Sequence, residues 1–270
     1  MRPLILITND DGIFSPGLLA VAEAVQQLGD ILIAAPRFQQ TTMGRAFPRG
    51  KDIGSIEEII LTVNGKPVTA FGITGSPAQA VAYAMLELTP RKPDLCISGI
   101  NYGENVGLSL TCSGTLGAAF EADSHGVPSI AVSRETPIAL QHSREYAEAS
   151  WEISGKIVRD IACKILGSGL PGEISIININ VPENADEHTE VRWTRQSRLN
   201  SAVFVKPAQR DRTKGYQLQS EPYPWQQKAE KDSDIYAIFH DKVISVTPIT
   251  WDLSVKTDWR FNHNKEVGLC

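Results

Sequence analysis

Two adjacent carboxylates near the amino terminus are the residues whose types and spacing most directly suggest chemistry. Asp10 and Asp11 stand side by side in Asn9-Asp10-Asp11-Gly12, one residue after the apolar run 4–7. Like charges repel at this distance, and a cation between or beside them removes that cost. Oxygen ligands favour Mg²⁺ or Mn²⁺ over Zn²⁺. The alternative is that one Asp caps the following turn and the other is solvated.

Two further polar loops follow apolar runs elsewhere in the chain. They are residues 39–44 (QQTTMG) and 99–103 (GINYG). Because the carboxyl ends of strands in an open parallel sheet lie along one edge, where ligands bind, loops far apart in sequence can converge there. Two carboxylates, a hydroxyl and an amide oxygen would then surround one hard cation.

A second group of residues has the composition of a phosphate cradle. Residues 112–119 read CSGTLGAA, so Ser-Gly-Thr opens a small-residue helix. Backbone N–H groups and hydroxyls at a helix start, together with the helix dipole, favour an anion. Ser113 as an ordinary N-cap is an equally good interpretation. Upstream, Asn105 can add an amide donor, whereas Glu104 would disfavour a phosphate unless it points away.

The elements that must position these loops follow from apolar periodicity and from cap and turn residues. Apolar runs predict strands at residues 4–7, 31–35, 94–98, 129–132 and 174–181. Helices are expected from Ser15 to Gly29 and over residues 78–88, 113–122 and 144–166. Asn64-Gly65 predicts a hairpin between residues 59–63 and 68–71, and a second hairpin is expected between 235–238 and 243–246. This alternation predicts an α/β fold, a Rossmann-like, mostly parallel sheet flanked by helices.

The character of the chain changes after Pro182. We expect a catalytic core over residues 1–182 and an extension over 183–270, with short strand-like runs and several tryptophans. The extension belongs to the same structural domain and does not fold independently. Because an isolated hairpin is marginally stable, we expect it to serve as an oligomerisation arm.

Composition and charge exclude several classes of function. The chain has 270 residues, a formal net charge of −5 and a pI of about 5.6. An acidic balance argues against a nucleic-acid polymer as partner. The start is no signal peptide, and no run reaches the ~20 apolar residues that span a bilayer. Four widely spaced cysteines indicate reduced thiols. We therefore expect a cytoplasmic protein with no membrane partner.

Known catalytic motifs do not account for the loops. The sequence contains no GxxxxGK[ST], no HExxH and no GxSxG, and its glycine-rich loop does not match GxGxxG. The five histidines lack metal-ligand spacing and are better interpreted as structural or surface residues.

The motifs together resemble those of the SurE family of survival-protein phosphatases. In family order they are ILITNDDGIFSPGL, AAPRFQQTTMGR, TGSPAQAVAYA, SGINYGENVG, SGTLGAAFEA, GVPSIAVS, ININVP and SDIYAIFHDKVISVTPI, from residue 4 to about 249. The TNDDG start and SGINxGxN followed by SGTxGAA are the most specific of these.

The resemblance implies a Rossmann-like core whose C-terminal hairpin and extension are exchanged between subunits of a homodimer or homotetramer. It implies a phosphatase of nucleoside 5′-monophosphates, and in some members of 3′-monophosphates and short polyphosphate, with one divalent cation per subunit. Carried over by motif, Asp10 and Asp11 are catalytic. The metal ligands are Asp10, Asp11, Thr41 and Asn101, and the phosphate or substrate contacts are Asn9, Asn105, Ser113, Gly114 and Thr115.

One motif departs from the family pattern at several positions. The second motif usually reads Ala-Pro-Asp-Arg, two residues, then Ser-Gly, whereas this chain has Arg37 for the acid, Thr41 for the serine and Thr42 for the glycine. Thr41 keeps the hydroxyl with a stiffer side chain, and Thr42 removes the flexibility of glycine. A non-catalytic nucleotide-binding module and a metal-dependent hydrolase of another class are the rival hypotheses. For the reaction, direct attack by water, with either Asp as base, and an aspartyl-phosphate intermediate both stay open.

Overall fold

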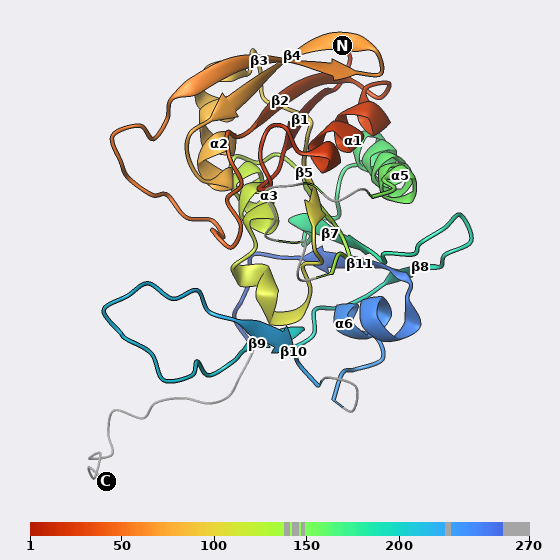
Figure 1. The fold of residues 1–270 in the computed structure, drawn as a ribbon. Coiled ribbons are helices and arrows are strands. Elements are labelled where there is room, and N and C mark those ends of the chain that lie inside the picture. The colour runs from red at the N-terminus through yellow and green to blue at the C-terminus, as the bar shows by residue number, and fades with distance from the viewer. Residues whose placement is uncertain (138–140, 142–145, 147–148, 225–227, 256–270) are drawn as a thin grey trace, which may run out of the picture.

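A mixed β-sheet between two helical layers organises the molecule (Figure 1). The structure is a computed structural model, and it describes residues 1–137, 141, 146, 149–224 and 228–255. Within these residues the strand order is β3-β4-β2-β1-β5-β6-β7-β11-β8. The strands are β1 (Leu4–Thr8), β2 (Asp30–Pro36), β3 (Ile56–Val63), β4 (Lys66–Ile73), β5 (Leu95–Tyr102), β6 (Ser129–Arg134), β7 (Ile176–Val181), β8 (Val191–Trp193) and β11 (Ile244–Ile249).

The six central strands β4, β2, β1, β5, β6 and β7 run parallel to one another. Strand β3 is antiparallel to β4, and β11 is antiparallel to β7 and parallel to β8. The predicted α/β fold with a mostly parallel sheet is therefore confirmed. A separate two-stranded ribbon consists of β9 (Ala202–Phe204) and β10 (Ser220–Pro222).

Helices cover both faces of the sheet. They are α1 (Pro16–Val25), α2 (Pro77–Tyr83) with the π-helical turn η1 (Ala84–Leu88), α3 (Gly114–Ser124), α5 (Glu152–Ser168) and α6 (Asp234–Tyr236) with the π-helical turn η3 (Ala237–Asp241). Ile5 and Ile7 of β1 pack with α1 and α5, whereas Leu4 and Leu6 pack with α2 and α3. A strand buried on both faces has to be apolar throughout, which is why residues 4–7 read as an unbroken apolar run. None of the described helices is long and apolar enough to cross a membrane.

Cap and turn residues act largely as predicted. Ser76 accepts the N–H of Gln79, whose side chain in turn accepts the N–H of Ser76, a capping box. Asn64 and Gly65, with φ of +47° and +73°, form the tight turn between β3 and β4. Ser15 occupies the N-cap of α1 but its side chain makes no capping hydrogen bond.

The predicted hairpin at residues 235–246 is wrong. Ser233 caps a helical segment instead, because its hydroxyl accepts the N–H of Tyr236 at 3.3 Å and its carbonyl accepts that of Ala237 at 3.0 Å. Residues 235–238 are therefore helical, and only β11 is a strand. A four-residue apolar run does not by itself distinguish a strand from a buried helical turn.

Three boundaries also differ from the prediction. Residues 99–102 continue β5, because after a register shift Asn101 and Tyr102 pair with Ser133 and Arg134 of β6. Helix α5 begins at Glu152 rather than at 144, and residues 142–145 and 147–148 lie outside the described residues. Strand β7 begins at Ile176 rather than at 174, and it is buried at every position because it lies between β6 and β11.

Candidate active site

The two carboxylates lie at the carboxyl end of β1, in the middle of the sheet. Asp10 and Asp11 are only 4% and 2% exposed. Their loop is closed by Asn9, whose amide nitrogen donates to the carbonyl of Gly12 and whose oxygen accepts the N–H of Gly12, both at 3.1 Å. Gly12 has φ +107°, a conformation that a side chain would strain. The sequence Asn-Asp-Asp-Gly thus builds a tight turn with both carboxyl groups held inside.

Neutral hydrogen-bond donors surround these carboxylates. Asp10 accepts the Thr115 hydroxyl at 2.7 Å. Asp11 accepts the backbone N–H of Tyr102 at 3.1 Å and the Gln39 side-chain amide at 3.3 Å. Among the described residues neither carboxylate forms an ion pair with a basic side chain. The negative charge of the pair is therefore not balanced by any described lysine, arginine or histidine.

The pKa values of both carboxyl groups are raised, as expected for buried acids without a cationic partner. Burial raises the pKa of Asp10 to about 6, and the Thr115 hydrogen bond only partly opposes it. Burial and then the charge of Asp10 raise the pKa of Asp11 to about 8, against the hydrogen bonds from Tyr102 and Gln39. A cation bound beside two such carboxyls would favour their ionised forms and lower both pKa values.

The surroundings of this pair suit a small, hard cation. Gly114 packs on Asp10 so closely that a Cβ there would lie 2.7 Å from the Asp10 Cβ and 2.8 Å from its Oδ2. No group of three or more His, Cys, Asp or Glu side chains able to hold a metal lies within the described residues. Any cation at this place would therefore be held by two carboxylates with hydroxyl and amide oxygens, a donor set typical of Mg²⁺ or Mn²⁺.

The other two expected ligands lie on segments that touch the carboxylates. Asn101 directly precedes Tyr102, whose N–H binds Asp11, and the Asn101 side-chain amide donates to the carbonyl of Gly103 at 2.6 Å. Thr41 follows Gln40, whose N–H donates to the carbonyl of Asp10 at 2.7 Å. The structure thus brings both segments to the pair, as the sequence predicts.

The start of α3 faces the same carboxylates. Ser113 is the N-cap, and its hydroxyl oxygen accepts the N–H of Leu116 at 3.2 Å, which leaves the hydroxyl proton available. Gly114 and Thr115 occupy the first turn, where N–H groups have no acceptor within the helix. The N-cap and phosphate-cradle interpretations are therefore compatible, because Ser113 can do both.

Asn105 reaches this cluster from the loop between β5 and α3. Its side-chain amide donates to the Ser133 hydroxyl at 2.8 Å and lies 3.4 Å from the Thr115 hydroxyl. Glu104, the neighbouring carboxyl group, has a pKa raised to about 7 by burial.

Several residues at the site were not predicted. Gln39 lies in a predicted loop, but its contact with Asp11 has no local signature. Tyr146 donates its hydroxyl to the carbonyl of Asp11 at 3.1 Å and stacks on Tyr102. Asn178 and Asn180 of β7 bind the backbone of Asn105. The only sequence signal for this last pair was two polar residues in an otherwise apolar strand.

The comparisons with known proteins agree with this geometry. The model of the family described as Survival protein SurE matches residues 5–202. The chain belongs to this family. A protein of Thermococcus gammatolerans named 5′-nucleotidase SurE is 37% identical over 269 residues, which cover 98% of this chain and 96% of that protein. One of the same name from Methanocaldococcus jannaschii is 36% identical, with 98% of both chains covered.

A solved SurE structure has the same fold. The crystal structure of the SurE protein from Aquifex aeolicus is 29% identical, covers 93% of this chain and 95% of that one, and superposes with a TM-score of 0.71. The family model ends at residue 202, yet the SurE relatives cover nearly the whole chain. The segment after residue 202 is therefore part of what these proteins share.

Two of the departures from the SurE pattern, Arg37 and Thr42, are accommodated locally. Arg37 turns to Glu57 of β3, with a 3.0 Å ion pair between half-exposed side chains. Thr42 keeps the backbone that glycine would favour, with φ +62°, and its hydroxyl donates to the carbonyl of Thr41 at 2.7 Å. The loop therefore follows a glycine-like path despite the threonine.

The extension is tied to the site loops by Asp234. This buried carboxylate accepts the N–H groups of Gly107 and Ser197, each at 2.9 Å, and burial raises its pKa to about 6. Gln196 donates to the carbonyl of the same Gly107 at 2.9 Å. Gly107 opens the 3₁₀ turn η2 (Gly107–Thr111) that leads to Ser113. The extension thus fixes the loop that carries Asn105.

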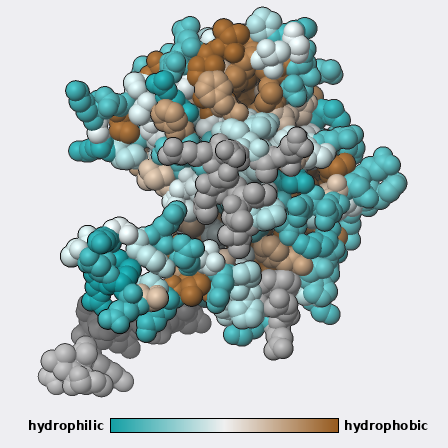
Figure 2. All heavy atoms as spheres, viewed as in Figure 1, coloured by the Kyte–Doolittle hydropathy of each residue, from teal (hydrophilic) through white to brown (hydrophobic). Residues whose placement is uncertain are grey.

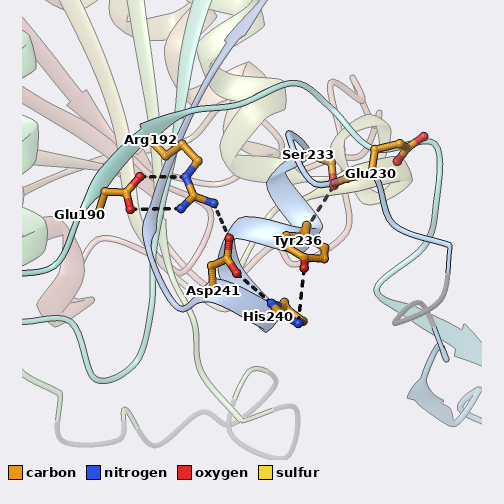
Figure 3. A network of polar contacts seen from close by, with 7 residues as sticks. All are labelled: Glu190, Arg192, Glu230, Ser233, Tyr236, His240 and Asp241. Carbon is orange, nitrogen blue, oxygen red and sulfur yellow. Dashed lines mark hydrogen bonds and ion pairs between the residues drawn. The ribbon is translucent and has the colours of Figure 1, made fainter.

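A surface network joins β8 to η3 (Figure 3). Arg192 binds both oxygens of Glu190, at 2.9 and 3.1 Å, and also Asp241. Asp241 in turn contacts His240, which lies 3.4 Å from the Tyr236 hydroxyl. Because these side chains are largely exposed and far from the carboxylates along the fold, we interpret the network as structural.

Proposed function

We propose that this protein is a divalent-metal-dependent phosphatase that hydrolyses nucleoside 5′-monophosphates to nucleoside and inorganic phosphate. The observation that carries the proposal is the pair of buried, unneutralised carboxylates, Asp10 and Asp11, facing the first turn of α3. The family relationship and the name 5′-nucleotidase SurE of the relatives support the choice of reaction and substrate.

One Mg²⁺ or Mn²⁺ ion per subunit would be held by Asp10, Asp11, Thr41 and Asn101. When bound, the ion polarises a phosphoryl oxygen and offsets charge in the transition state. This donor set fits because neither carboxylate has a cationic partner among the described residues, and because the pKa of each is raised by burial.

The phosphate group is proposed to lie at the start of α3. The N–H groups of Gly114 and Thr115 and the free proton of the Ser113 hydroxyl are donors there, and the helix dipole adds to them. Asn105 would donate one side-chain amide proton to the phosphate. That proton now makes only a long contact, 3.4 Å between the amide nitrogen and the Thr115 hydroxyl oxygen. Asn9 donates one side-chain amide proton to the carbonyl of Gly12, and its second amide proton would be its donor to the substrate.

The nucleophile in this proposal is water, oriented by Asp10 or Asp11 for in-line attack. Neither carboxylate has a basic side chain beside it among the described residues, so each can accept a proton once ionised. Trapping a phosphorylated Asp10 or Asp11 would replace this step with an aspartyl-phosphate intermediate.

The test is phosphate release from a panel of 5′- and 3′-nucleoside monophosphates and short polyphosphate, with Mg²⁺, Mn²⁺ or EDTA. Asp10→Asn should abolish release. Asp94→Asn is the matched control, because Asp94 binds the N–H of Leu4 at 2.7 Å, at the opposite end of β1. Release that needs metal, survives in the control and is lost in Asp10→Asn supports the proposal. Nucleotide binding without release would instead indicate a non-catalytic binding module.

We also propose that the extension mediates a homodimer or homotetramer by exchange between subunits. The support is that β9 and β10 form only a two-stranded ribbon, with Phe204 72% exposed. The ribbon's loop projects from the body beside an open notch (Figures 1 and 2). A monomeric mass by light scattering would contradict the proposed exchange between subunits.

A cytoplasmic location is proposed as well. It is supported by the described cysteines Cys96, Cys112 and Cys163, which form no disulfide with one another.

A further inference from the structure

Two asparagines interrupt an otherwise apolar strand in the middle of the protein. Asn178 and Asn180 lie on β7, alternate with Ile177 and Ile179, and are completely buried. An apolar side chain would suit such positions better, since a buried amide lowers stability unless its hydrogen bonds are made. Their presence therefore needs a reason other than packing.

Both asparagines bind the main chain of a single residue, Asn105, which lies more than seventy positions earlier in the sequence. The Asn105 N–H donates to the Asn180 side-chain oxygen at 2.7 Å. The Asn105 carbonyl accepts the side-chain amides of Asn178 at 2.9 Å and of Asn180 at 3.0 Å. Three hydrogen bonds from one strand thus fix the backbone at Asn105 on both its donor and its acceptor side.

The side chain of Asn105 continues the chain of contacts toward the carboxylates. It donates to Ser133 at 2.8 Å and approaches Thr115 at 3.4 Å, and Thr115 donates to Asp10 at 2.7 Å. A continuous buried series of polar groups therefore runs from β7, through the loop after β5 and the start of α3, to the end of β1.

The bonding of Asn178 is informative because it is incomplete. Its amide nitrogen binds Asn105, but its oxygen is buried without a hydrogen-bond partner among the described residues. An unpaired buried oxygen lowers stability.

We propose that Asn178 and Asn180 are positioning residues that hold Asn105 in place for its contact with the substrate phosphate. The inference rests on the proposed phosphatase function and adds to it two residues that do not touch the substrate. Displacements of the order of 1 Å at a contact of this kind can lower the rate about 100-fold.

The test uses Asn180→Leu and Asn178→Leu, because leucine has nearly the shape of asparagine without its polar atoms. Thr247→Val is the matched control. Thr247 is as deeply buried and lies opposite Asn178 on β11, and among the described residues its side chain hydrogen-bonds to Thr194 and Ser245 rather than to Asn105. For each protein kcat and KM with AMP and Mg²⁺, the Kd of orthophosphate by calorimetry with Mg²⁺, and the melting temperature are measured.

Positioning predicts that Asn180→Leu lowers kcat/KM at least tenfold and weakens orthophosphate binding by a similar factor. Asn178→Leu should lower kcat/KM while its melting temperature stays level or rises, since the unpaired oxygen is gone. Thr247→Val should keep kcat/KM within twofold of the wild type. A purely structural role predicts that the melting temperature falls in all three variants and that kcat/KM, measured well below it, does not.

A double-mutant cycle tests whether Asn180 acts through Asn105. In an Asn105→Ala background, Asn180→Leu should change kcat/KM by less than twofold, because the side chain that it positions is absent. A full additional tenfold loss overturns the proposal, as does an orthophosphate Kd equal to that of the wild type in both leucine variants. If the wild type hydrolyses no nucleotide, the proposed function fails, and the orthophosphate Kd alone then decides the positioning role. If the wild type also binds no orthophosphate, both the proposed function and the positioning role are wrong.

Discussion

Replacing Asp10 by asparagine should make the metal-free protein more stable while it abolishes turnover. Unfolded aspartates titrate near 3.9, whereas burial raises the pKa of Asp10 to about 6 in the folded protein. The folded state therefore binds more protons between these values, and the free energy of unfolding falls as the pH rises from about 4 to 6. Two pKa units correspond to about 3 kcal/mol above pH 6. Removing this carboxyl should raise the melting temperature by roughly 5–10 °C for a chain of this size.

The assay is calorimetric unfolding of wild type and Asp10→Asn in EDTA at pH 4, 6 and 8. The two proteins should melt together at pH 4, and the difference should grow from pH 4 to pH 6 and grow further toward pH 8, where Asp11 titrates in the wild type. The pKa of Asp11, raised to about 8 partly by the charge of Asp10, should fall in the variant. Added Mg²⁺ should stabilise the wild type more than the variant, since ligand binding to the folded state raises stability. A variant that melts at or below the wild type at pH 8 in EDTA would refute the reasoning.

Three further substitutions test separate parts of the argument. Gly114→Ala should lower kcat/KM at least 100-fold, because the new Cβ would lie 2.7 Å from the Cβ of Asp10. Gly167→Ala in α5 is the control: a Cβ there meets open space, so it should stabilise the protein by about 0.5–1 kcal/mol and leave kcat/KM unchanged. Equal effects in the two would contradict the close approach. Thr42→Gly should relieve the φ of +62° and raise stability by about 1 kcal/mol in urea unfolding, and a loss would show that the threonine is not strained. Arg192→Ala should change stability by less than about 1 kcal/mol and leave kcat/KM intact; a large loss of activity would give the surface network a functional role.

The core of the fold could be predicted because its determinants are local. Four apolar residues before Asn9 predict a buried central strand, and Asn64-Gly65 predicts the turn between β3 and β4; the structure has both. The failure at residues 235–238 has both a local and a non-local side. Ser233, just before the run, caps a helical turn, and Asp234 at the start of that turn accepts the N–H of Gly107, 127 positions away. No pattern within the run reports a contact at that distance.

The same distinction divides the site. Asp10 and Asp11 are adjacent in sequence, so their mutual repulsion, and with it the proposal of a bound cation, can be inferred from the sequence alone. Gln39, Tyr146 and the asparagines of β7 act through partners 28 to 135 positions away, and their role appears only once the strands are placed.

The sequence nevertheless predicts that the asparagines of β7 have hydrogen-bond partners, although it does not identify them. Isoleucine and asparagine alternate in residues 176–180, and once this strand is predicted to be central, buried amides must have hydrogen-bond partners. The sequence alone thus states that partners exist, and the neighbouring strand ends and their loops are the nearest candidates. What it cannot state is which of them satisfies the amides. That choice depends on the register between β6 and β7, which sets Asn180 beside Ser133, the residue that accepts the amide of Asn105. Under the proposed positioning role, the two asparagines of this doubly buried strand mark the place where the strand supports the site.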